Sequence, residues 1–83
     1  MSTILEETVK RLNRIAEANH DEFKCAVTIE VRRRATAYRF FCAEPADNHV
    51  FVEGIGTTPD DAAKNAALKI SEACVAWGYD EVD

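Results

Sequence analysis

The sequence has few of the residues from which metal and redox sites are usually built. Its two histidines, His20 and His49, have no companion ligand at metal-site spacing. The three cysteines are far apart, odd in number and without a C-x-x-C pair. We therefore expect no metal site and no disulfide framework, and interpret the thiols as small buried hydrophobic groups. The cysteines are Cys25, Cys42 and Cys74.

Glycine and long hydrophobic runs are also scarce. No apolar run is long enough to cross a bilayer and no basic-then-apolar leader opens the chain, so we expect a cytoplasmic protein. The pair Gly54 and Gly56 lacks the third glycine of a dinucleotide-binding loop. The positions suggest no nucleophile–histidine–acid arrangement either. We expect a protein that is not an enzyme and that binds no cofactor.

Negative charge dominates the second half of the chain. The net charge is −5, but residues 1–41 carry +2 and residues 42–83 carry −7. A general nucleic-acid-binding protein usually shows a basic footprint. This chain instead has one local cluster of arginines in an otherwise acidic molecule.

Two stretches have the three-and-four spacing of apolar residues that predicts helices. The first is residues 3–18, with Thr3 as N-cap. The second is a single long helix over residues 58–77, with Thr58 as N-cap and Gly78 as its left-handed stop. Its stripe is mostly alanine, so it can lie very close to a sheet. The stripe consists of Ala63, Ala66, Ala67, Ile70, Ala73, Cys74 and Trp77.

Alternation of apolar and polar residues predicts three strands between these helices, over residues 24–32, 36–43 and 49–53. For the first hairpin we predict the register that keeps the core-facing side of both strands wholly apolar. The same register sets Glu30 opposite Arg39 on the other face. The core-side pairs of that register are Val31–Tyr38, Ile29–Phe40 and Val27–Cys42.

The predicted architecture is a two-layer α+β sandwich in the order α-β-β-β-α. The three-stranded antiparallel sheet has one fully apolar face, and both helices pack on it. Eighty-three residues make one domain, residues 1–83. We expect the acidic tail, residues 79–83, to fray.

This order of elements resembles that of the double-stranded RNA-binding domains. The match lies in Val50 to Gly56, where the third strand runs into G-x-G, and in the alanine-rich segment 62–68. In that family, lysines at the start of the second helix grip phosphates across the RNA major groove. The corresponding positions here are Pro59, Asp60 and Ala63. The resemblance therefore implies the fold, but not duplex-RNA binding by that route.

The candidate partner-binding residues form three groups. Consecutive arginines at the first hairpin suit phosphates or an acidic protein, or else keep the hairpin soluble. A predicted Phe41–Phe51 pair on the outer sheet face suits a partner, a second copy of the chain or stacked nucleobases, unless other segments cover it. Acids at the start of the last helix mimic phosphates or only cap the helix. The candidates are Arg32, Arg33, Arg34, Arg39, Phe41, Phe51, Asp60 and Asp61.

We therefore predict a non-enzymatic interaction module that binds a protein or nucleoprotein partner. Small acidic α+β chains of this kind look similar to phage-encoded inhibitors, including anti-CRISPR proteins, in size, charge and architecture. The alternative is direct nucleic-acid (RNA) binding through the arginine hairpin, aided by Lys10, Arg11 and Arg14. A third possibility is a homodimer through the outer sheet face. No membrane partner is expected.

Overall fold

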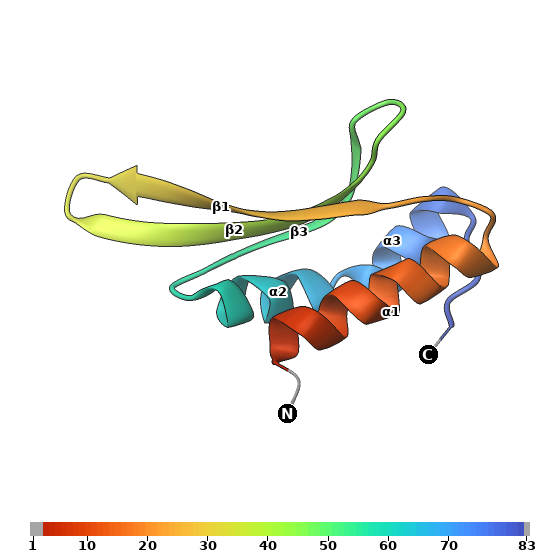
Figure 1. Ribbon diagram of the computed structural model, residues 1–83, viewed down its shortest axis with the longest axis horizontal. Coiled ribbons are helices and arrows are strands. Elements are labelled where there is room, and N and C mark those ends of the chain that lie inside the picture. The colour runs from red at the N-terminus through yellow and green to blue at the C-terminus, as the bar shows by residue number, and fades with distance from the viewer. Residues whose placement is uncertain (1–2, 83) are drawn as a thin grey trace.

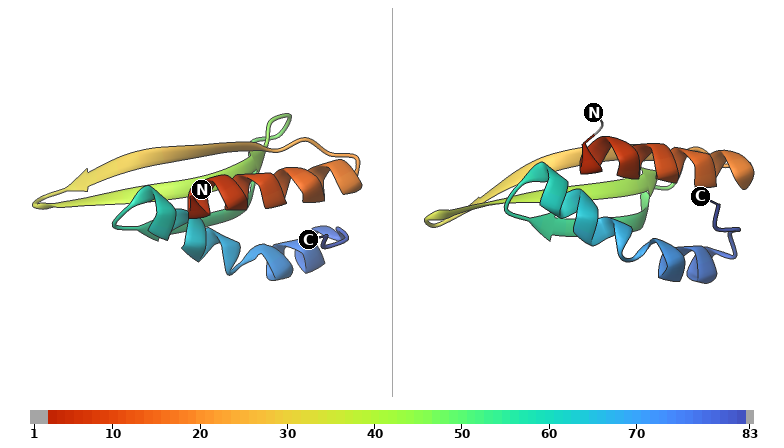
Figure 2. Two further views of the ribbon diagram at one scale, coloured as in Figure 1. Left: turned by 60° about the horizontal axis from the view of Figure 1, so that its bottom comes forward. Right: turned by 90° about the horizontal axis from the view of Figure 1, so that it is seen from below.

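Three antiparallel strands form one layer of the molecule, and three helices form the other (Figures 1 and 2). The computed structural model describes residues 3–82. The strand order is β1-β2-β3, and all the helices lie on one face of this open sheet. The predicted two-layer α+β architecture is confirmed. The elements are α1 (Ile4–Ala18), β1 (Lys24–Arg32), β2 (Ala35–Glu44), β3 (His49–Gly56), α2 (Pro59–Ala67) and α3 (Ile70–Trp77).

The predicted long C-terminal helix is two helices. α2 ends at Ala67 and α3 begins at Ile70, because the amide of Lys69 donates to the carbonyl of Ala66 at 3.0 Å and tightens the turn between them. No glycine or proline marks this break, so helix propensity does not locate it. The break leaves Leu68 exposed and turns Ile70 into the core.

The outer ends of this helical segment lie where the sequence predicts them. The hydroxyl of Thr58 accepts a hydrogen bond from the amide of Asp61 at 3.0 Å, and Gly78 ends α3 with a φ of 70°. At α1, the hydroxyl of Thr3 accepts from the amide of Glu6 at 3.1 Å. Each of these three caps depends only on residues next to the helix end, so the sequence alone suffices to predict its position.

α2 lies directly on β3, because both contact surfaces consist of very small residues. A Cβ atom added at Gly54 would lie 2.3 Å from the backbone nitrogen of Ala66, and one at Gly56 would lie 2.6 Å from that of Ala62. The alanines that face the strand are fully buried. The close approach predicted from the alanine stripe is confirmed. The buried alanines are Ala62, Ala63 and Ala66.

The register predicted for the first hairpin is wrong by two residues. The turn contains only Arg33 and Arg34, so Arg32 pairs with Ala35 and the whole ladder moves. Arg33 makes this short turn possible by adopting a left-handed φ of 52°. The predicted Glu30–Arg39 pair therefore does not form. The observed pairs include Val31–Thr36, Glu30–Ala37, Ile29–Tyr38, Thr28–Arg39 and Val27–Phe40.

The second hairpin lacks the predicted Phe41–Phe51 pair, since Phe41 pairs with Glu53, and β3 also contains a bulge. Cys42 pairs with Val52, but the next residue of β2, Ala43, pairs with Val50, so Phe51 is the extra residue. Phe51 is 5% exposed and belongs to the core. β3 also continues to Gly56, three residues beyond the predicted end.

The segment after α3 is docked, which contradicts the predicted fraying over residues 79–82. Tyr79 joins an aromatic cluster, in which the ring centroids of Phe23 and Phe51 lie 4.7 Å apart and those of Phe51 and Trp77 lie 5.1 Å apart. The amide of Asp80 donates to the side chain of Asn19 at 2.9 Å. The tail thus fastens onto the end of α1. Asp83 lies outside the described residues.

Candidate interaction surface

The β1–β2 hairpin projects past the ends of the helices (Figure 1). We call its residues 27–38 the arm. The arginines that the sequence singles out, Arg32, Arg33 and Arg34, lie together at the tip of the arm and are all exposed. Among the described residues, only the first of them has an ion pair, at 3.3 Å from the carboxylate of Glu30. Its side chain remains 82% exposed, so this pair contributes little to stability and leaves the guanidinium accessible.

A row of aliphatic side chains runs along β1 toward the tip. Val27 lies opposite the buried Phe40, and Ile29 lies opposite Tyr38, so the row belongs to the helix-facing side of the sheet. The exposed fraction rises along the row, from 36% at Val27 to 62% at Ile29 and 73% at Val31. It rises because the helices end before the strands do. Sequence reasoning assigned all three side chains to the core and missed this surface.

A hollow of about 190 Å³ lies between α1 and β1 at the inner end of the row. Val27 lines both the hollow and the row, so the two form one apolar surface at the base of the arm. The hollow is lined by Leu5, Val9, Cys25, Ala26, Val27 and Phe40.

The outer face of the sheet carries no exposed aromatic pair. Phe41 lies opposite Glu53, while Phe51 is in the core on the other side, so the predicted Phe41–Phe51 pair is wrong. Arg39 covers Phe41, with its guanidinium 4.9 Å from the ring centroid, and its Nε donates to Glu53 at 3.0 Å. Arg39 is therefore bound within the sheet, away from the arginines of the tip. The outer face thus lacks the patch that suggested a homodimer there.

The carboxylates of Asp60 and Asp61 both accept hydrogen bonds within the molecule. A carboxylate oxygen of Asp60 accepts a hydrogen bond from the amide of Leu5 at 3.1 Å, so this side chain at the start of α2 caps the start of α1. Asp61 accepts from the hydroxyl of Thr57 at 3.2 Å and remains exposed. The carboxylate of Asp60 thus caps α1, whereas that of Asp61 accepts only from a side chain. Both acids lie in the first turn of α2, and Asp60 is half-buried where the resemblance places a phosphate-gripping lysine.

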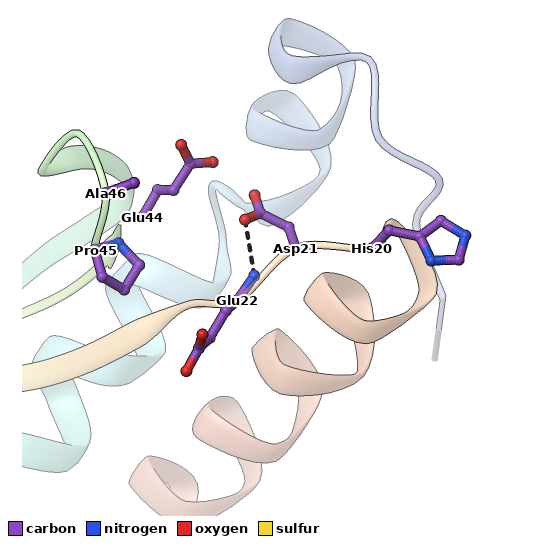
Figure 3. A pocket seen from close by; sticks show the side chains of 6 residues that line it. All are labelled: His20, Asp21, Glu22, Glu44, Pro45 and Ala46. Carbon is purple, nitrogen blue, oxygen red and sulfur yellow. Dashed lines mark hydrogen bonds between the residues drawn. The ribbon is translucent and has the colours of Figure 1, made fainter.

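The end of the molecule opposite the arm is acidic. A hollow of about 470 Å³ there is lined by His20, Asp21, Glu22, Glu44, Pro45 and Ala46 (Figure 3). The ring of His20 points away from the carboxylates. Within residues 3–82, no group of three or more histidine, cysteine and acidic side chains could hold a metal ion.

Hydrogen bonding couples the titrating groups at this acidic end. The hydroxyl of Tyr79 donates to the carboxylate of Asp21, which lowers the pKa of Asp21 and raises the pKa of Tyr79 to about 12. The nearby carboxylate of Asp21 raises the pKa of Glu44, because it favours the protonated form of Glu44 as a hydrogen-bond donor and repels the ionised form. Asp21 thus favours its ionised form and links the tail to the end of α1.

Comparisons of the chain with protein-family models, with curated proteins and with solved structures found no match. The resemblance to the double-stranded RNA-binding domains therefore stays a prediction. In the part of the chain that the structure describes, no helix has the length and apolarity needed to span a bilayer.

Proposed function

We propose that the chain is a non-enzymatic module that binds a protein through the arm. One observation carries this proposal: three exposed arginines lie at the tip of a projecting hairpin whose helix-facing side is an uncovered aliphatic row. Protein interfaces combine an apolar centre with arginine, and a few such residues supply most of the binding energy. The partner surface that fits the arm is apolar with acidic groups beside it.

The backbone of Arg33 supports a functional role for this side chain. The first central residue of a two-residue hairpin turn needs a positive φ, for which glycine is the favoured residue. Arg33 adopts a φ of 52° there, at a cost of about 1–2 kcal/mol relative to glycine. Unfavourable backbone geometry of this kind concentrates at functional sites.

A nucleic acid is a poorer fit to the arm than a protein. Aliphatic side chains such as Ile29 and Val31 offer nothing to a phosphate backbone, and the chain outside the three arginines has a net charge of −8, since the whole chain has −5. Arg11, which the nucleic-acid alternative requires, is already paired with Glu81 at 2.8 Å. Asp60 occupies one of the family's lysine positions and would repel phosphate.

A protein subunit of a nucleoprotein complex is a suitable class of target. With the arm bound to such a subunit, the acidic end would extend toward a basic nucleic-acid channel and block it sterically and electrostatically. This is the mode of inhibition expected from the similarity to small acidic phage-encoded inhibitors. The edge of β1 also adds backbone groups to the surface, since β1 pairs only with β2 within residues 3–82.

The test is affinity capture from a cognate lysate with matched variants. Ile29→Asp and Arg33→Glu alter the arm, and we expect each variant to reduce the amount of captured partner at least tenfold. Val75→Asp and Lys69→Glu make the same changes at exposed positions on the helical side, and should retain it. A partner that survives both arm variants would place the interface elsewhere on the molecule.

Nucleic-acid binding is measured separately, by titrating duplex and single-stranded RNA and DNA at increasing salt concentration. We expect no binding near physiological salt. Binding whose affinity falls steeply with salt, and which Arg33→Glu abolishes, would contradict protein binding as the proposed function and favour direct nucleic-acid binding.

A further inference from the structure

Two cysteines that are distant in the sequence lie directly opposite one another in the sheet. The observed register pairs Cys25 of β1 with Cys42 of β2, whereas the register predicted from the sequence puts Val27 opposite Cys42. Both thiols belong to the helix-facing side, at the base of the arm. Cys42 is fully buried, and Cys25 is half-buried against the same core.

The backbone geometry at this pair suits a disulfide. The pair that closes a two-residue turn, here Arg32 and Ala35, is hydrogen-bonded, and the pairs alternate from there along the ladder. Seven steps from the turn, Cys25 and Cys42 form a non-hydrogen-bonded pair, in which the Cα atoms are about 4.5 Å apart and the side chains are closest. Disulfides span Cα separations of roughly 4.4–6.8 Å.

The two thiols differ in access and acidity. The hollow of about 190 Å³ between α1 and β1 opens beside Cys25, so a small molecule can approach its sulfur. The neighbouring thiol of Cys42 lowers the pKa of Cys25 by hydrogen bonding to its thiolate, and the same interaction raises the pKa of Cys42. Cys25 is therefore the thiol that ionises and reacts first.

We propose that Cys25 and Cys42 form a modification site that a small-molecule disulfide, such as oxidised glutathione, converts to a cross-strand disulfide. This proposal stands on the register and the hollow, and it does not depend on the proposed partner-binding function.

The reaction is a pair of thiol–disulfide exchanges. The thiolate of Cys25 attacks one sulfur of the small disulfide, forms a mixed disulfide and releases one thiolate, which takes up the proton that Cys25 has lost. Cys42 then loses its proton and attacks the sulfur of Cys25, which releases the second small thiol. The two protein thiols are oxidised and the small disulfide is reduced to two thiols, so a thiol reductant reverses the change.

The new bond would cross-link β1 to β2 where the arm leaves the helix-covered part of the sheet. It would enclose the turn and the arginine tip within one covalent loop, residues 25–42. The register of the hairpin would then be fixed covalently. Oxidation would act on the segment that carries the candidate interaction surface without covering any of its exposed side chains.

The experiment incubates the full chain with oxidised glutathione and counts the remaining thiols by alkylation and mass spectrometry. We expect two of the three thiols to disappear, the intact mass to fall by that of two hydrogen atoms, and peptide mapping to link Cys25 to Cys42. The third thiol, Cys74, lies buried on α3 and should still be alkylated after unfolding.

Single variants test the order of the two steps. Cys74→Ser is the matched control and should form the same disulfide. Cys42→Ser should stop at a stable glutathione adduct on Cys25, while Cys25→Ser should leave Cys42 unmodified in the folded chain.

Several outcomes would overturn the proposal. One is the survival of all three thiols in the folded chain under conditions that oxidise the urea-unfolded chain. The others are a link that includes Cys74 and a link between two chains. The wild-type peptide map decides these points even if a cysteine variant folds poorly. The readout is covalent and needs no partner, so its failure is distinguishable from a failure of partner capture.

Discussion

At Gly54 the sheet has no room for a side chain. Because a Cβ atom there would meet backbone atoms of α2 at 2.3 and 2.4 Å, neither side can yield without separating the two layers. We expect Gly54→Ala to lower the free energy of unfolding by about 3 kcal/mol, the upper end of the usual range for overpacking. Urea denaturation followed by circular dichroism measures this.

Gly78→Ala is the contrast for that prediction. Among residues 3–82, no atom outside Gly78 and its two chain neighbours lies within 4 Å of a Cβ there. The φ of 70° is unfavourable for alanine, however, so we expect a smaller loss of about 1–2 kcal/mol. If Gly54→Ala unfolds at the wild-type urea concentration, α2 does not lie against β3 as described.

Tyr79 makes a hydrogen bond whose contribution depends on pH in a defined window. The pKa of Asp21 is lowered in the folded state, so its share of the stability is present above the ordinary value of 3.8 and is lost as the pH falls through the lowered value. The pKa of Tyr79 is raised, so its share is present below the ordinary value of 10.0 and is lost as the pH rises through about 12. We expect Tyr79→Phe to be less stable than wild type between these limits, with the difference vanishing outside them.

Urea denaturation of both chains at a series of pH values tests this expectation. Tyr38→Phe, which removes a tyrosine hydroxyl from the arm instead, serves as the control. A stability difference between Tyr79→Phe and wild type that stays constant below pH 3.8 would show that Asp21 is not the acceptor.

At the scale of the elements, the turn of the arm places a charged side chain, Arg33, at a position where its backbone conformation lowers stability. Arg33→Gly removes the unfavourable left-handed backbone, and we expect it to raise the free energy of unfolding by about 1 kcal/mol while it weakens partner binding. Arg34 has no positive φ, so Arg34→Gly removes the same charge without this gain and should lower stability slightly. Thermal denaturation compares the two. Equal effects on stability would mean that the turn at Arg33 is not left-handed.

The two hairpins show how far the sequence can predict this fold. Alternation in residues 24–32 and 36–43 locates β1 and β2 to within one residue at either end, because the period of apolar residues is a local property. The pairing of the strands depends on the turn, and nothing in Arg33-Arg34 announces a left-handed first residue. The absence of the predicted Glu30–Arg39 pair and the opposition of Cys25 to Cys42 both follow from that one turn.

The exposed position of the arginines at the tip could be predicted from the sequence, whereas the exposure of the aliphatic row could not. Consecutive arginines between two predicted strands must lie at a hairpin tip, whatever the register. Ile29 and Val31 have the same pattern as core residues, and their exposure follows from where the helices end relative to the strands. Phe51 shows the converse: the bulge turns a side chain predicted on the outer face into the core.

At the scale of the whole molecule, the two ends differ in charge and in how far the helices cover the sheet. The arm carries the arginines and an uncovered apolar row, while the other end carries Asp21, Glu22 and Glu44 around a hollow (Figure 3). The helices, the aromatic cluster and the docked tail all gather toward the acidic end. The helix-covered part of the chain thus separates the projecting hairpin from the acidic surface, as the proposed function of binding with one end and blocking with the other requires.

The docked tail, residues 79–82, packs at the acidic end of the molecule, and its removal tests how much it contributes to the free energy of unfolding. Tyr79 and Val82 pack against the core from one side, and Arg11 and Ser71 both bond to the carboxylate of Glu81 at 2.8 Å. Two half-buried side chains contribute about 3 kcal/mol together, so we expect a chain that ends at Gly78 to lose roughly that much stability in urea denaturation. Glu81→Gln weakens only a surface pair and should cost less than about 1 kcal/mol. If the shortened chain unfolds at the same urea concentration as the full chain, the tail frays and the aromatic cluster does not depend on Tyr79.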